Sequence, residues 1–471
     1  MEKIARIDRR RVLGGLAALV VLPPGMAVAA AARGGPAKPA ASKPPAGPKP
    51  PAAPQAGFLT GTEFGIVPGS TDDQSAAVQA AFDAAHEQGR PLLLPAGQIF
   101  VQNLAFPARA RIVGQPGQTV LVGRLDNPVG TAETAIDLML EGVGFSAGVG
   151  GPGGERALLE VADSSGVLLS NCQFVLSNSS GLLLRNSAAT IADCTFDQLD
   201  VAVFSHDSRG LIVRSNRISA CANGGILIWR GQPGPDGSIV SGNRVSGILA
   251  KGGGNGQNGN AINVFRADNV IVEGNVIDDC DFSAVRINSA RNASIRGNTC
   301  TNLREVGIYS EFAFTGSVIS GNVVDGAAGG ISITNLDQGG EIAVCTGNIV
   351  RNITASSPTN PDVTPYGIYA EANTTVIGNT VSAVPGPGII AGYGPYLKNV
   401  VIADNVISDA DTGIGVSVVD KAGAVKIAGN LISGAKSHAI VGLAWEKVVT
   451  PDLAADAAKY PNVAIGDNTV V

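Results

Sequence analysis

Short runs of alternating apolar and polar residues fill the C-terminal two-thirds of the chain, and they repeat one phrase. The phrase is an apolar residue, two spacers, Asn, one spacer and a second apolar residue, as in "VIADNVI" from Val401 to Ile407. It recurs at intervals of roughly 22 to 38 residues. Alternation with a period of two predicts short β-strands, and a repeat of this length predicts one solenoid coil per copy.

Aligning the copies places one polar residue in the same column of every coil. Apolar residues or Cys stand three positions before it and two positions after it. Parallel coils stack ~4.8 Å apart, so these flanking residues should form continuous stacks inside a tube. A polar residue repeated inside a stack must be satisfied, which predicts a ladder of side-chain amides rather than catalytic groups. The column comprises Cys172, Cys194, Asn216, Asn243, Asn275, Asn298, Asn322, Asn348, Asn379, Asn405, Asn430 and Asn468.

Both ends of the tube should carry helices. A capping box is predicted from Thr71 and Gln74. The helix that follows should place Val78, Phe82 and Ala85 on one face and should end at Gly89. "DLAADAAKY" predicts a short helical stretch before the last coil. The N-terminal stretch resembles the opening of pectate-lyase-like β-helix proteins, a resemblance carried by Phe64-Gly65, Thr71-Asp72-Asp73 and Leu94-Pro95-Ala96-Gly97.

The N-terminus reads as an export signal. Arg9-Arg10-Arg11 precedes a short apolar stretch that Pro23 and Pro24 end, too short for a membrane span. Arg9 and Arg10 resemble a twin-arginine signal, and a general secretory signal is the alternative. The expected organisation is a signal peptide at 1–32, a Pro/Ala/Lys-rich linker at 33–57, a cap with the first coils at 58–130, and β-helix repeats at 131–471.

Taken together, the chain resembles a bacterial family of twin-arginine-translocated repetitive proteins. Besides the signal and the cap, the run "GYGPYLKNVVIADNVISDADTGIGVSV" carries this resemblance. It implies an all-β, right-handed, single-stranded parallel β-helix of the pectin-lyase type. It also implies export to the periplasm or cell envelope, and it implies no reaction.

The charge and the cysteine pattern limit the kinds of ligand and partner that the protein is expected to bind. The chain has a formal net charge of −6, and its basic residues concentrate in the signal and linker, so the body should not bind nucleic acid through its general field. Only three His are present, and no metal-type Cys/His spacing occurs, so neither metal nor cofactor is expected. Cys172 and Cys194 should stack one coil apart, as a disulfide or as two core thiols. The oligomeric state stays open.

Candidate chemistry gathers on one strand of each coil. Two coils carry an insertion at the same corner, in "SGILAKGGGNGQNGN" and "NITASSPTNPDVTPY", and these loops should stand about 19 Å apart. Between them the outward positions bring rare aromatics together with amides, which predicts a walled sugar-binding groove; a solvated face with cross-strand ion pairs is the alternative. The predicted contacts are Trp229, Asn263, Phe265, Asn288, Tyr309, Thr334 and Tyr369, with Phe204 in the column of Trp229 and Phe265.

Three charged residues in that tract are the catalytic candidates. Glu311 and Glu371 share a column two coils apart, about 9–10 Å, which overlaps the separation of an inverting glycosidase pair. Arg286 with Tyr309 could instead serve a lyase or epimerase. The motifs of polygalacturonases and pectate lyases are incomplete, and His206-Asp207 alone matches the Asp-Pro-His-Asp of alginate epimerases.

Three interpretations follow for the function. The first is an exported β-helix that binds or modifies a polysaccharide. The second is a non-catalytic envelope scaffold for a protein partner, which should expose an apolar patch along one face. The third is a degenerate polysaccharide lyase or hydrolase that keeps only binding. Whether the protein is an enzyme stays open; if it is, the residues favour a polysaccharide substrate.

Overall fold

The structure is a computed structural model that describes residues 57–471 except 125–126, 149, 152 and 255. The expected signal peptide, with Arg9 and Arg10, and the linker up to residue 56 lie outside the described residues.

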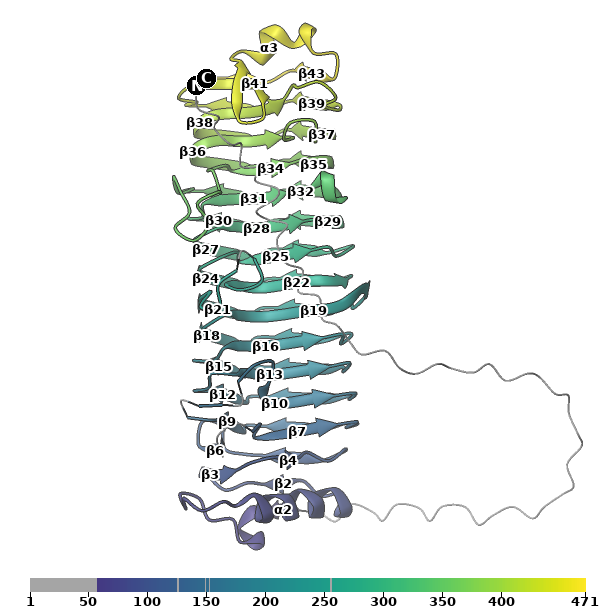
Figure 1. The fold of residues 1–471 in the computed structure, drawn as a ribbon, viewed down its shortest axis with the longest axis vertical. Coiled ribbons are helices and arrows are strands. Elements are labelled where there is room, and N and C mark those ends of the chain that lie inside the picture. Colours follow the sequence, from purple (N-terminus) through teal and green to yellow (C-terminus); the bar gives the residue numbers. More distant parts are fainter. Residues whose placement is uncertain (1–56, 125–126, 149, 152, 255) are drawn as a thin grey trace, which may run out of the picture. The chain divides into compact units, whose positions relative to one another are not determined.

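Successive coils stack along one axis, and their strands pair in parallel with the coil before and the coil after (Figure 1). Each coil gives one strand to a 16-stranded sheet, here sheet A, and up to two strands to a 28-stranded sheet, here sheet B. Within the described residues, the pairing of β41 (His438–Ala444) with β42 (Lys447–Thr450) is the antiparallel exception. The predicted all-β parallel solenoid is confirmed.

Sheet A is one flat face of the tube. Its strands are β1 (Leu59–Thr60), β2 (Leu92–Leu93), β5 (Arg111–Val113), β8 (Met139–Glu141), β11 (Val167–Ser170), β14 (Ala189–Ala192), β17 (Ile212–Arg214), β20 (Ile239–Ser241), β23 (Ile271–Glu273), β26 (Ser294–Arg296), β29 (Thr315–Ser320), β32 (Glu341–Thr346), β35 (Ala372–Ile377), β37 (Lys398–Ala403), β39 (Val425–Ala428) and β43 (Val463–Gly466).

Sheet B consists of two columns of strands. The first column, which follows the Asn corner, contains β3 (Gly97–Val101), β6 (Thr119–Gly123), β9 (Gly144–Ser146), β12 (Gln173–Val175), β15 (Thr195–Asp197), β18 (Arg217–Cys221), β21 (Arg244–Ile248), β24 (Val276–Cys280), β27 (Thr299–Leu303), β30 (Val323–Asp325), β33 (Ile349–Arg351), β40 (Leu431–Ser433) and β44 (Thr469–Val470). The second column contains β4 (Leu104–Ala105), β7 (Gly130–Glu133), β10 (Ala157–Ala162), β13 (Ser180–Arg185), β16 (Val201–His206), β19 (Gly224–Pro235), β22 (Asn260–Asp268), β25 (Val285–Asn288), β28 (Val306–Glu311), β31 (Gly329–Ile333), β34 (Ile368–Ala370), β41 and β42. Two long strands, β36 (Thr380–Ala391) and β38 (Val406–Ser417), run through both columns and join them.

The Asn column forms the predicted ladder inside the tube. Asn298 donates both its backbone N–H and its side-chain Nδ2 to Oδ1 of Asn322, at 3.0 and 2.9 Å. Asn322 repeats both bonds to Asn348 and donates Nδ2 to the carbonyl of Ile295 at 3.0 Å. Because each amide bonds groups of the coil before it and of the coil after it, the ladder fixes the corner of each coil that carries it.

In the two coils before Asn216, Cys172 and Cys194 take the place of Asn in the ladder column. Cys194 donates its N–H to Oδ1 of Asn216 at 2.9 Å, and the N–H of Cys172 approaches Sγ of Cys194 at 3.4 Å. Both are free and buried in the structure, as are Cys221, Cys280, Cys300 and Cys345. The interpretation of Cys172 and Cys194 as stacked core thiols therefore fits the structure better than a disulfide.

The N-terminal helix covers the first coil as predicted, but its start is different. Helix α2 (Ser75–Gln88) buries Val78 and Phe82 completely and ends at Gly89 in the left-handed conformation, φ 60°. Its N-cap is Gln74, so the predicted capping box from Thr71 is wrong. The Gln74 amide instead exchanges two hydrogen bonds with the backbone of Val67, at 2.7 and 3.0 Å. A short turn, η1 (Gly61–Phe64), precedes it.

The last coil is covered by the predicted helical stretch. It consists of α3 (Leu453–Asp456) and η3 (Ala457–Lys459), and the side chain of Asp452 caps α3 by accepting the N–H of Ala455 at 3.0 Å. Leu453 is fully buried against the coil. Among the helices of the described chain, none is long and apolar enough to cross a membrane.

Candidate functional site

The predicted outward positions lie on the second column of sheet B, where strand pairing sorts them into two rows. One row pairs Leu227, Asn263, Arg286, Tyr309, Ser332 and Tyr369. The other row pairs Trp229, Phe265, Asn288 and Glu311. Thr334 and Glu371 continue this row, because each directly follows one residue of the pair Ile333 and Ala370. The expected register is confirmed with one correction: Phe204 pairs with Leu227, so it belongs to the first row and not to the row of Trp229.

Three aromatic side chains nevertheless meet on β16, β19 and β22, and we call them the aromatic trio. The rings of Phe204 and Trp229 contact edge to face with centroids 5.2 Å apart, and those of Trp229 and Phe265 with centroids 5.9 Å apart. All three side chains are only half-buried. An outward, partly exposed aromatic surface of this kind is unusual in a chain in which aromatic residues make up only 4%.

Strand β19 runs past its neighbours beside the trio (Figure 1). Its register with β22 shifts between Trp229 and Gly234, so the chain bulges outward there. Arg266 ties the bulge to the trio: it donates a hydrogen bond to the carbonyl of Gly231 at 2.8 Å, and its guanidinium carbon lies 4.6 Å from the centroid of Phe265. The bulge therefore projects from the sheet at one end of the aromatic trio.

The catalytic candidates form an ion-pair network instead of standing free. Arg286 donates Nε and one terminal nitrogen to the two carboxylate oxygens of Glu311, at 2.6 and 2.8 Å. Its other terminal nitrogen donates to Glu305 at 3.2 Å. These side chains are at most 2% exposed. Asn288, which is half-buried, donates to Glu311 at 2.8 Å and is the part of the network nearest to solvent.

Burial and pairing set the protonation of this network. Burial disfavours the charge of Arg286, but the attraction of Glu311 and Glu305 outweighs it and raises the pKa of the guanidinium above its usual range. For Glu305 burial is the larger effect, and it raises the pKa of the carboxyl although Arg286 opposes it. Arg286 is thus a permanent cation whose hydrogen bonds are already committed to two carboxylates.

The remaining acid of the pair, Glu371, is also inaccessible. Its side chain is 2% exposed, and Oε2 accepts the N–H of Leu336, the first residue of η2 (Leu336–Gln338), at 2.8 Å. The predicted contacts Asn263 and Thr334 are 4% and 7% exposed. Neither carboxylate of the proposed glycosidase pair therefore faces solvent.

Downstream of the network the tyrosines form a small cluster of their own. Tyr309 and Tyr366 are each 7% exposed and pack together with Val306. The ring of Tyr369 contacts that of Tyr366 edge to face, with centroids 5.4 Å apart, and Tyr369 stays half-buried. Tyr309 is therefore covered, and Tyr369 carries the accessible aromatic surface here.

The two insertion loops do not stand apart as walls, and this expectation is wrong. The first loop, 249–259, and the second, 352–367, both reach Asp281: Ala250 donates its N–H to the Asp281 carboxylate at 2.8 Å, and Thr359 donates its hydroxyl to the Asp281 carbonyl at 2.7 Å. Asn360 of the second loop also donates to Glu305 at 2.9 Å. The second loop thus folds back across the coils between the insertions and reaches Glu305, while Gly256 of the first loop packs against the guanidinium of Arg286.

Sequence reasoning missed the residues that close this network. Glu305, Ser283 and Asn360 join Arg286 and Glu311: Ser283 and Asn360 each donate to Glu305, at 3.2 and 2.9 Å. They lie at corners and in a loop, outside the alternating rows. A signal existed in Glu305 itself, since an unpaired carboxylate beside an apolar strand usually needs a cation.

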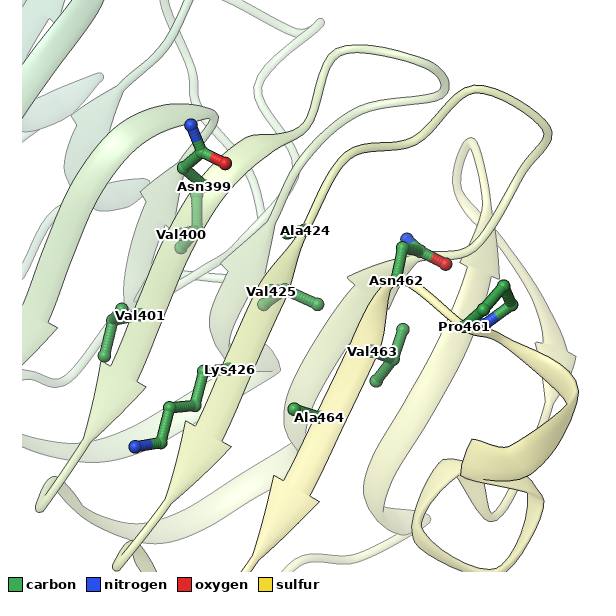
Figure 2. A pocket seen from close by; sticks show the side chains of 10 residues that line it. All are labelled: Asn399, Val400, Val401, Ala424, Val425, Lys426, Pro461, Asn462, Val463 and Ala464. Atoms are coloured by element: carbon green, nitrogen blue, oxygen red, sulfur yellow. The ribbon is translucent and has the colours of Figure 1, made fainter.

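Two cavities lined by described residues lie away from this tract. One, of about 410 Å³, is a hollow on the outer face of sheet A over β37, β39 and β43, lined by side chains such as Val401, Lys426 and Ala464 (Figure 2). The other, of about 400 Å³, lies beside α2 near His86 and Phe106. Within the described residues, no group of three or more His, Cys, Asp or Glu is placed to hold a metal ion.

Two family models match this chain, each over less than half of it. Residues 154–258 match the right-handed β-helix region, and residues 259–448 match the family described as periplasmic copper-binding protein, NosD. Comparison with curated proteins finds no significant match. The protein is thus a right-handed parallel β-helix.

Solved structures with the same fold are distant in sequence. A PL6 alginate lyase in complex with a trisaccharide is 14% identical with a TM-score of 0.52, covering 88% of this chain and 95% of that chain. The N-terminal fragment of gene product 12 of bacteriophage Phi29 is 14% identical with a TM-score of 0.50, covering 83% and 71%. The A-module of a mannuronan C-5 epimerase from Azotobacter vinelandii is 14% identical with a TM-score of 0.43, covering 88% and 99%.

Proposed function

We propose that this protein is exported and binds a polysaccharide along the second column of sheet B. The observation that carries the proposal is the aromatic trio, whose half-buried rings face outward on three successive coils. Trp229, Phe265, Asn288 and Tyr369 are the accessible members of the predicted set and would contact the sugar. Rings that stack on sugar faces beside amides that bond hydroxyls are the usual composition of such sites.

The geometry favours binding over catalysis. A general acid or base must reach the reacting atoms. Glu311 is 1% exposed and instead accepts two hydrogen bonds from Arg286, and Glu371 accepts one from the backbone of Leu336. Arg286, Glu311 and Glu371 then act as the support that holds Asn288 and the surrounding strands in place.

The copper named for the matched family does not fit the described side chains. Copper prefers thiolate, thioether and imidazole ligands. The six Cys are buried in the tube, burial raises the pKa of the Cys221, Cys300 and Cys345 thiols to about 12, and no metal-holding set is found among the described residues. We therefore derive no step through copper.

The binding proposal predicts the effect of removing one ring. Trp229→Ala and Tyr369→Ala should each weaken oligosaccharide binding by about 1–3 kcal/mol, because each removes a stacking surface. Binding would be found on a glycan array and measured by calorimetry. Phe58→Ala is the matched control, since Phe58 is 46% exposed next to β1 of sheet A, away from the second column of sheet B. Equal losses in the control, or no glycan binding at all, would reject the proposal.

The scaffold interpretation is the second candidate, and one observation favours it. The outer row of sheet A includes exposed aliphatic side chains, with Ile212, Val318 and Val344 at 37%, 42% and 40% exposure. If no glycan binds, the result would favour the scaffold interpretation over polysaccharide binding.

The proposed export by the twin-arginine route has its own test. Replacing Arg9 and Arg10 together by Lys should leave the full-length protein in the cytoplasm, since that route requires the arginine pair. Cell fractionation measures the result, and Arg11→Lys is the control. Normal export of the double variant would favour the general secretory route.

A further inference from the structure

The ion-pair network fixes the charge that a ligand meets beside Asn288. Arg286 donates three of its nitrogens to carboxylates, two to Glu311 and one to Glu305. One guanidinium between two carboxylates leaves a net negative charge when both are ionised. The cation is 2% exposed, so it offers no free face to an anion from outside.

Asn288, a half-buried residue of the network, connects the carboxylate of Glu311 to the surface. Its Nδ2 donates to Oε1 of Glu311 at 2.8 Å, and its Oδ1 accepts the hydroxyl of Ser289 at 2.7 Å. A sugar lying on Asn288 therefore meets an amide whose orientation is fixed and a carboxylate directly behind it. Hydroxyl groups can donate toward such a surface, whereas an anionic group would be desolvated against like charge.

A half-buried cation of the tract, Arg266, is also partly committed. Arg266 lies two coils before Glu311, donates to Gly231 at 2.8 Å and covers the ring of Phe265. Farther down the tract, Glu371 adds another carboxylate. The body as a whole carries more acidic than basic residues, which adds a weak repulsion of polyanions.

We propose that this face selects uncharged oligosaccharides, in which no sugar carries a carboxylate or sulfate group. The inference rests on the proposed polysaccharide function and specifies its substrate class. Selection comes from the neutral aromatic surface together with the carboxylates that Arg286 already holds, so that the ligand gains stacking while the guanidinium of Arg286 is not available to it.

The test compares matched ligands on the full exported protein. Neutral hexose and N-acetylhexosamine oligomers are paired with uronic acid oligomers of the same length, and binding is measured by calorimetry at low and at moderate salt. We expect at least ~10-fold tighter binding of the neutral member. Any residual uronate binding should strengthen as salt rises, because screening weakens repulsion.

Three outcomes separate this inference from the function on which it rests. Uronate binding that equals or exceeds neutral binding, or that weakens as salt rises, overturns the inference while the polysaccharide function stands. Loss of uronate binding in Arg266→Gln would then identify Arg266 as the cation responsible. Absence of binding to every oligomer rejects both. Neutral binding that is at least ~10-fold tighter than uronate binding and that Trp229→Ala weakens supports both.

Discussion

Replacing Asn322 by Leu is expected to lower the free energy of unfolding by about 2–6 kcal/mol, since two buried polar groups each lose a partner worth ~1–3 kcal/mol. The backbone N–H of Asn298 loses its acceptor, and the carbonyl of Ile295 loses its donor. Both groups lie inside the tube, where water cannot replace the missing amide. Urea unfolding followed by circular dichroism measures the change.

Two further variants make this result specific to the ladder. Asn322→Cys should cost less than Asn322→Leu, because Sγ of Cys194 already stands as the partner of the Cys172 N–H in the same column. Asn178→Leu, at an exposed position outside the ladder, should change stability by less than ~0.5 kcal/mol. Equal losses in Asn322→Leu and Asn178→Leu would contradict a structural ladder.

Arg286→Leu is expected to be as damaging, at about 3–5 kcal/mol, because it leaves Glu305 and Glu311 buried without their cation. The loss should depend on pH. Burial raises the pKa of Glu305 even with Arg286 present, and without the opposing charge of Arg286 the pKa of Glu305 should rise further. The variant should then be most stable below the pKa of an unfolded Glu and should lose stability as pH rises through the raised pKa of Glu305 in the folded protein. Thermal unfolding from pH 4 to pH 8 measures this.

A compensated variant separates charge from packing. Replacing Arg286, Glu305 and Glu311 together by apolar residues of similar size removes the buried charges as a set, and such replacements are often neutral. Recovery of most of the lost stability would assign the damage to unpaired charge. A triple variant as unstable as Arg286→Leu would instead assign it to lost packing and would contradict our account of the network.

The fold could be predicted from the sequence because its determinants are repeated. Asn216, the later Asn residues of its column and the apolar positions around them recur at the same place in each coil. One alignment of the repeats therefore predicts the strands, the ladder and the rows of outward residues. Phe204 shows the limit: its coil has no Asn in the ladder column, and its row follows from the pairing of β16 with β19 rather than from its aromatic character.

The candidate site could be predicted only in part, because loops do not repeat. The alternation correctly placed Arg286, Glu311 and Trp229 on the outside of the sheet, but an outward position is not an exposed one. The path of the second insertion loop depends on single contacts such as Asn360 with Glu305 and Thr359 with Asp281. No periodic pattern encodes such contacts, so the sequence could not reveal that the acids are covered.

The amide ladder also has a consequence for how proteins of this kind can change length. Each rung presents the same acceptor to the coil before it and the same donors to the coil after it, as Asn298, Asn322 and Asn348 show. Duplicating or deleting one whole coil therefore leaves no amide without a neighbour, whereas an insertion of half a coil would break the ladder. Length can thus vary by whole modules, and new surfaces can be added at the corners without redesigning the interior.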